Sequence, residues 1–299
     1  MKRDREGMMT THETIWGYIF ISPWLIGLLL FWVGPVGSVF QMSFTDNNIL
    51  QSTSFVGIRN YLQILGSDQL FWESIKNTLL YVILRVPLIM AIGFLIAVLL
   101  NKTCKGITFF RALIYFPSIL PVVAAGALWM LLLNPDLGWI PSWMEIIGLP
   151  KTNLLGDLVT VKPTLVLISL WQIGSYMVIF LSNLQNVPSH LYESASIDGA
   201  GSIKRLLHIT IPMMSPTFLY VMIVDIIASF QVFSLAFILT NGGPGSSTLF
   251  YILYLYRQAF TFFQMGYASA MAVLLFLVMI VLTVIMMKTS KRWVHYERM

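Results

Sequence analysis

The 299-residue chain is 57% hydrophobic and only 10% charged, with a formal net charge of +5. Soluble domains carry about 25% charged residues to cover their surface, so this composition excludes an ordinary water-soluble protein. One cysteine, Cys104, excludes an internal disulfide and argues against a cysteine-based metal cluster, and no metal site is predicted.

Six apolar runs are each close to the roughly 20 residues that a helix needs to cross a bilayer. We therefore predict an all-α polytopic membrane protein with six transmembrane helices, in a single domain covering residues 1–299. The predicted spans are approximately Ile15–Phe40, Thr78–Leu100, Phe110–Leu133, Thr164–Leu184, Pro216–Leu239 and Tyr267–Met287. The first run is too long for a removable signal peptide and lacks a small-residue cleavage site. Kinks are expected at the prolines inside spans, which are Pro23, Pro87, Pro117 and Pro121.

The segments on the predicted outer side contain local structure of their own. An amphipathic run, Asn60–Leu65, predicts a short interfacial helix. Clusters of turn residues at 134–138 and 241–245 lie just outside spans three and five. Nearby rings, including those of Trp139, Trp143 and Trp171, suit the aromatic belt at the lipid headgroups.

Orientation follows from the basic residues, because short cytoplasmic loops are enriched in lysine and arginine. One side of the membrane holds Lys2, Arg3, Arg5, Lys102, Lys105, Arg111, Lys204, Arg205, Lys288, Lys291, Arg292 and Arg298. The other side holds Arg59, Lys76, Lys151, Lys162 and Arg257, and Arg85 lies within a span. Together these account for all 18 basic residues. We expect both termini and the loop at 188–212 to be cytoplasmic.

The loop at 188–212 is a polar island between two spans. Ser189 is expected to cap a short helix that runs to about Asp198, and the glycines of 199–201 then break it through a left-handed conformation. Ser202 is a second candidate cap, and Pro212 is expected to begin a new element. Two amphipathic helices meeting at a glycine elbow fit either a lipid surface or a socket for another protein.

The same loop resembles a known motif. Glu193-Ser194-Ala195, then Gly199, then Ile209-Thr210-Ile211-Pro212 resembles the EAA loop in membrane subunits of ATP-binding-cassette (ABC) importers. That loop reads E-A-A, three residues, G, nine residues, I-x-L-P, and this chain departs from it at Ser194 and Ile211. The surrounding words SLWQIGSYMVIFLSNLQNVPSHLYESASIDGAG and FILTNGGPG are similar to the maltose-type permeases, over essentially the whole chain.

The resemblance implies a type I importer permease that forms half of a translocation pore. It implies a second permease subunit of similar fold, two cytosolic ATPase subunits that bind ATP and Mg, and an extracytoplasmic solute-binding protein. The substrate would be a sugar, with an oligosaccharide favoured and a polyol or glycerol-phosphate-like ester as alternatives, imported across a bacterial cell membrane. The dipeptide Gly-Lys never occurs, so the chain has no P-loop and we expect neither a cofactor nor enzyme activity.

The resemblance assigns roles within the loop. ATPase coupling falls on Glu193, Ser194, Ala195, Asp198, Gly199, Ala200 and Gly201. Glu193 would pair with a basic group of the ATPase, and Gly199 would let two backbones approach closely. Asp198 has a structural alternative, which is to cap the elbow by accepting backbone N–H groups.

Polar residues within the spans form a second candidate site. Asp225 is the only acid deep in a span and Arg85 the only base, so a mutual ion pair is one interpretation. The candidate substrate pathway is Ser118, Val122, Gln172, Tyr176, Asp225, Ser229, Gln231 and Val232. Any of these residues fits helix–helix hydrogen bonding equally well. Alignment with the maltose-type family adds Ala228. At Ala228, Ser229 and Val232 this chain has smaller groups, which implies a wider cavity or no tight site.

Two rival functions stay open on the sequence alone. An ion-coupled secondary transporter would use Asp225 and Arg85 as a relay. An intramembrane enzyme would need a nucleophile–base pair or a metal-ligand pair, and neither is evident.

Overall fold

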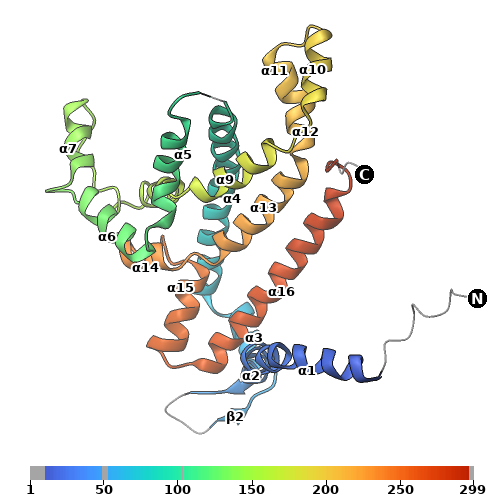
Figure 1. Ribbon diagram of the computed structural model, residues 1–299. Helices are drawn as coiled ribbons and strands as arrows, with labels where there is room; N and C mark the ends of the chain where they lie inside the picture. Colours follow the sequence, from blue (N-terminus) through green and yellow to red (C-terminus); the bar gives the residue numbers. More distant parts are fainter. Residues whose placement is uncertain (1–10, 49–52, 103, 296–299) are drawn as a thin grey trace, which may run out of the picture. The chain divides into compact units, whose positions relative to one another are not determined.

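The computed structural model describes residues 11–48, 53–102 and 104–295, and these are predominantly helical (Figure 1). The α-helices are α1 (Thr11–Leu28), α2 (Gly34–Met42), α3 (Arg59–Gly66), α4 (Gln69–Leu100), α5 (Ile107–Tyr115), α6 (Val122–Leu132), α7 (Trp139–Ile146), α8 (Val161–Leu170), α9 (Gly174–Leu184), α10 (Ser189–Ile197), α11 (Ser202–Arg205), α12 (Ile211–Met213), α13 (Ser215–Phe230), α14 (Ser234–Leu239), α15 (Tyr251–Tyr256) and α16 (Met265–Ser290). The π-helical turns are η1 (Leu29–Val33), η3 (Leu206–Thr210) and η4 (Arg257–Thr261), and η2 (Phe116–Ile119) is a 3₁₀ turn. The strands are β1 (Thr45–Asp46) and β2 (Ser54–Phe55), paired antiparallel.

The prediction of an all-α membrane protein is confirmed. Four helical segments of the described chain are long and apolar enough to cross a membrane, namely Ile15–Met42, Gln69–Leu100, Ser215–Leu239 and Met265–Ser290. Two bent helix pairs, at 107–132 and 161–184, give six spans when each pair is counted as one span. Span two begins nine residues before the predicted Thr78, because Asp68 caps α4 by accepting the Phe71 N–H at 3.0 Å.

The bends in spans three and four have different causes. Span three turns by 98° between Ile119 and Val122, where Pro117 and Pro121 lack the N–H groups that would continue the helix. The predicted kinks at these prolines are therefore confirmed. Span four turns by 47° at residues 171–173, which contain no proline, and the sequence did not predict this bend. By contrast, α4 continues as one helix through Pro87.

The described residues divide into two compact units. One comprises the described residues up to Gly66 with Gln258–Leu275, and the other comprises the described residues of Ser67–Arg257 and those from Phe276 onward. That the whole of residues 1–299 acts as one permease domain stays a prediction.

The first unit is held together around the predicted interfacial helix, which forms as α3. Asn60 of α3 is buried and donates from Nδ2 to the Ser43 carbonyl at 2.9 Å and the Thr45 carbonyl at 3.0 Å. The Tyr61 hydroxyl donates to Ser43 Oγ at 2.7 Å. At the start of α16, a Cβ on Gly266 would lie 2.0 Å from the Thr45 carbonyl oxygen, so only glycine permits this approach.

The core of the second unit lies around α4, which packs against α5, α8, α9, α13 and α15. Phe94 of α4 and Phe180 of α9 meet edge to face at 5.8 Å, and Phe218 of α13 contacts both rings. Met177 and Val221 are fully buried in the same cluster. This close-packed set fixes α4, α9 and α13 against one another.

Candidate functional site

The loop at 188–212 folds into a helical hairpin, which we call the coupling hairpin (Figure 1). Helix α10 ends in a Schellman motif: Ala200 N–H donates to the Ala195 carbonyl at 2.8 Å, and Gly199 N–H donates to the Ser196 carbonyl at 3.1 Å. Gly199 has φ of +74°, the left-handed conformation that favours glycine. The predicted glycine elbow is confirmed.

The candidate side-chain caps of the hairpin do not form. Ser189 and Ser202 are the first residues of their helices, after Pro188 and Gly201, and neither helix has a side-chain cap. The backbone N–H groups there are left for solvent or a partner. The Asp198 carboxylate makes no hydrogen bond to any described residue, so it does not cap the elbow.

The second helix of the hairpin also extends past the predicted break. Helical backbone continues from α11 through η3 and α12 to Met213, so Pro212 does not begin a new element. The fixed φ of proline is helical, and Pro212 is the second residue of α12, which follows directly on the π-helical turn Leu206–Thr210. Only at Met214 does the chain turn into α13.

Side-chain bonds tie the two arms of the coupling hairpin together. The hydroxyls of Tyr192 and Thr210 are 3.0 Å apart, and Thr210 is buried. Arg205 Nη1 donates to Ser196 Oγ at 2.9 Å. The arms are linked both at the end of the hairpin that leads into α13 and near the elbow, which holds the two arms against each other.

The outer surface of the hairpin is unusually apolar for a polar loop. Ile197, Ile203 and Leu207 are 87%, 75% and 52% exposed. Of the predicted coupling residues, Glu193, Ser194, Asp198, Gly199 and Gly201 are exposed, and Ala195 and Ala200 are half-buried. The hairpin thus exposes isoleucine and leucine side chains together with the carboxylates of Glu193 and Asp198. This is the composition of a protein-docking surface.

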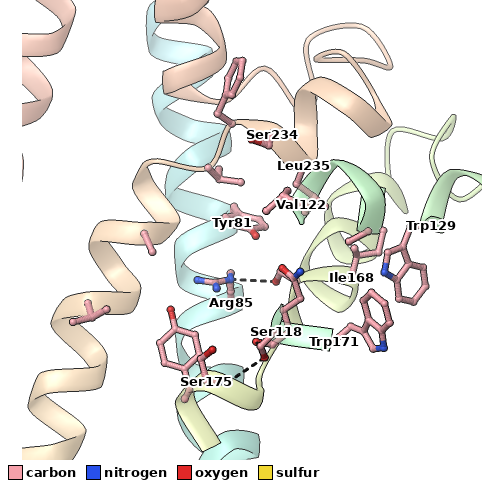
Figure 2. Close-up of a pocket in the computed structure, with 18 of the residues that line it drawn as sticks. Tyr81, Arg85, Ser118, Val122, Trp129, Ile168, Trp171, Ser175, Ser234 and Leu235 are labelled. Atoms are coloured by element: carbon pink, nitrogen blue, oxygen red, sulfur yellow. Dashed lines mark hydrogen bonds between the residues drawn. The ribbon is translucent and has the colours of Figure 1, made fainter. Parts of the chain in front are cut away.

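The second site is a cavity of about 480 Å³ within the second unit, which we call the central cavity. Its wall comes from α4, the bend of span three, α6, α8, α9, α13 and the start of α14. Figure 2 shows Tyr81, Arg85, Ser118 and Ser175 around this space. Its aromatic side includes Trp129 and Trp171, whose rings meet edge to face at 5.7 Å.

The two span bends meet at the central cavity and satisfy each other's backbone. Ser118 Oγ donates to the Gln172 carbonyl at 3.1 Å and accepts the Ser175 N–H at 3.2 Å. Gln172 Nε2 donates to the Pro117 carbonyl at 3.3 Å. Non-helical backbone at membrane depth is tolerated only where protein buries it or where it lines a water-filled cavity. Both bends therefore belong to the architecture of the cavity.

An ion pair lies in the wall of the cavity and confirms the predicted pairing. Arg85 Nη1 of α4 is bonded to Asp225 Oδ1 of α13, and it also donates to Ser229 Oγ at 2.6 Å. Arg85 Nε donates to Ser169 Oγ of α8 at 3.2 Å. The Asp225 side chain is fully buried and that of Arg85 is 12% exposed. One guanidinium thus joins three helices.

The predicted pathway residues separate into three groups. Ser118, Val122, Gln172, Tyr176 and Val232 line the central cavity, and so does Ala228. Asp225 and Ser229 are buried behind Arg85 and do not line it. Gln231 follows the end of α13, is exposed, and is outside the cavity wall.

Sequence reasoning missed several lining residues. Trp171 was assigned to a headgroup belt but lies in the cavity wall, and Tyr81, Trp129 and Phe233 were not singled out. Tyr81 is one helical turn before Arg85, and that spacing is the signal that could have found it.

A family model described as "Binding-protein-dependent transport system inner membrane component" matches residues 73–296, or 224 of the 299 residues. The chain belongs to this family. Members of the family are multi-pass membrane permeases, not enzymes. This permease is 39% identical over 289 residues to the probable ABC transporter permease protein YesP of Bacillus subtilis, covering 95% of this chain and 93% of the relative. It is 33% identical over 277 residues to the arabinooligosaccharides transport system permease protein AraP of the same organism, covering 91% and 88%.

A solved structure confirms the type I importer permease fold. One chain of a bacterial alginate ABC transporter, crystallised in complex with an alginate pentasaccharide-bound periplasmic protein, matches this permease with a TM-score of 0.84. The match covers 94% of this permease and 96% of that chain at 22% sequence identity. At this identity the likeness concerns the fold alone.

Proposed function

We propose that this permease is the membrane subunit of an ATP-driven importer of sugars, with oligosaccharides as the favoured substrates. The observation that carries the proposal is the central cavity, where hydroxyl, amide and aromatic groups meet at the junction of two broken spans. Sugars are bound by this combination of hydrogen-bonding groups and ring faces. The name of the relative AraP refers to arabinooligosaccharides, which supports the same substrate class.

The energy for transport would come from two cytosolic ATPase subunits that bind the coupling hairpin. Its exposed Ile197, Ile203 and Leu207 would enter an apolar groove on an ATPase, and Glu193 would pair with a basic residue there. Because Tyr192–Thr210 and Arg205–Ser196 bonds join the arms, closure of the ATPases would be transmitted to α13, which carries part of the cavity wall.

The remaining partners would be a second permease subunit of similar fold and an extracytoplasmic solute-binding protein that delivers the substrate. The coupling hairpin and both termini would face the cytosol of a bacterial cell. This orientation rests on the distribution of basic residues. Four of those residues, Lys2, Arg3, Arg5 and Arg298, lie outside the described residues.

The docking role is tested by a charge reversal on the hairpin, with the same charge reversal elsewhere on the protein as the control. Glu193→Lys changes an exposed residue of the hairpin, and Glu145→Lys makes the same change at an exposed residue of α7. In membranes containing the complete transporter, we expect Glu193→Lys to abolish solute-dependent ATP hydrolysis and uptake while expression and melting temperature are unchanged. Glu145→Lys should retain both activities. Unaltered ATPase recruitment and uptake with Glu193→Lys would contradict the docking role.

A further inference from the structure

The charges around the central cavity are unevenly placed. Among the described residues that line it, Arg85 is the one ionised side chain. Its counter-charge, Asp225, is fully buried and is not part of the lining. A ligand in the cavity can therefore contact the Arg85 guanidinium directly, whereas the Asp225 carboxylate is buried behind the guanidinium.

The wall of the cavity also holds N–H donors that are left for a ligand. A guanidinium has five N–H groups, and the bonds from Arg85 to Ser169, Asp225 and Ser229 use those on Nε and Nη1. The Tyr176 phenol forms a further hydrogen bond with Arg85, so at most one N–H of the guanidinium is left for a ligand. The indole N–H of Trp129, also in the wall, is buried and has no acceptor among the described residues.

These remaining N–H donors, together with the charge of Arg85, favour a particular ligand chemistry. A neutral sugar carries hydroxyls, which need acceptors as well as donors, and carboxylates are the strongest acceptors that a protein offers. The described lining contains no carboxylate. A carboxylate or phosphate on the ligand accepts only, and a guanidinium with adjacent hydroxyl groups matches it.

We propose that the central cavity recognises a sugar bearing an anionic group, either a uronate carboxylate or a phosphate ester, and that Arg85 is the residue that determines this specificity. The inference rests on the proposed import of sugars and names the substrate class of the same site. Asp225 has a positioning role: it holds the guanidinium in the wall and balances its charge when the cavity is empty. That balance keeps an anion from being trapped, and a translocation site must also release its substrate.

The test compares ligands that differ only in charge. The probes are a linear trigalacturonate, its fully methyl-esterified neutral form, and galactose 6-phosphate as the phosphate arm. Binding to the complete transporter in nanodiscs is measured without the solute-binding protein, whose own selectivity would otherwise enter. The variant is Arg85→Gln with Asp225→Asn, which removes both charges and leaves polar atoms at both positions.

We expect the wild-type transporter to bind trigalacturonate or the phosphate ester roughly tenfold or more tightly than the methyl ester, since hydrogen bonds to charged groups are the stronger kind. The double variant should lose this preference, so that its affinities for the acid and for the methyl ester become equal. Preference for the acid over the phosphate, or the reverse, identifies the anionic group.

Two different failures are distinguishable. Equal binding of trigalacturonate and its methyl ester by the wild type, or an unchanged preference in the double variant, overturns the role of Arg85 and leaves sugar import standing. If no saccharide of either charge binds or is imported with any solute-binding protein, the proposed function fails and this inference fails with it. The wild-type comparison decides the matter even if the double variant does not fold.

Discussion

Substitutions at the elbow of the coupling hairpin can distinguish the cost of backbone strain from the loss of contact with a partner protein. Gly199 has φ of +74°, and a Cβ built on it meets no atom within 4 Å. A side chain therefore meets no clash at its Cβ, and the expected cost of phenylalanine here is the left-handed backbone energy, about 1–2 kcal/mol. Gly106, in the loop before α5, has φ of +86° and equally open space around its Cβ, so Gly106→Phe should cost the same.

The two substitutions should nevertheless differ in function. In the proposed complex the space around Gly199 is occupied by an ATPase subunit, so a phenyl ring there blocks docking. We expect equal falls in melting temperature for Gly199→Phe and Gly106→Phe, and loss of substrate-stimulated ATP hydrolysis for Gly199→Phe alone. Gly199→Asn should restore much of the activity, because asparagine tolerates the left-handed conformation and is smaller. Equal ATPase losses in the two phenylalanine variants would refute the reasoning.

Three further predictions concern the second unit. Phe180→Ala, at a fully buried ring of the core, should lower the free energy of unfolding by about 3–5 kcal/mol in detergent, as followed by thermal unfolding. Gly174→Ala should lower the melting temperature and impair uptake, because the new Cβ would lie 2.6 Å from Tyr115 Cα and 2.7 Å from Ser118 Oγ, at the joint between the two bent spans. Ala228→Trp should reduce uptake of long oligosaccharides without loss of stability, since Ala228 lines the cavity; unimpaired uptake would remove this face of α13 from the pathway.

The bends show where sequence reasoning stops. Pro117 and Pro121 mark the break in span three, because a proline removes a backbone donor wherever it occurs. The bend at 171–173 has no such local cause. It is stabilised by Gln172, which donates to the carbonyl of Pro117, 55 residues away in the chain. A bend that depends on a tertiary partner has no local signature, so the cavity between the two bends could not be located from the sequence.

The hairpin shows the same limit at its helix ends. The glycine elbow was predictable, because the left-handed conformation favours glycine at one position in the motif. The caps were not: Ser189 and Ser202 have the right side chains, but each helix begins one residue earlier than a serine cap requires. Candidate caps in adjacent positions differ by too little energy for composition to choose between them.

For the Arg85–Asp225 pair, the partners could be predicted from the sequence, but the depth of each side chain could not. Two opposite charges inside spans predict each other, because an unpaired charge at membrane depth is costly, and that pairing was correct across 140 residues of sequence. The depth of each partner was not predictable, and it bears on the role of Asp225. An acid that carries ions must meet water or the ion during transport, yet Asp225 is fully buried behind the guanidinium, and only Arg85 reaches the cavity. Exposing Asp225 would require breaking the buried pair, at a cost of about 3–5 kcal/mol. Asp225 is placed to hold Arg85 against α13, and the group that the substrate meets is the arginine.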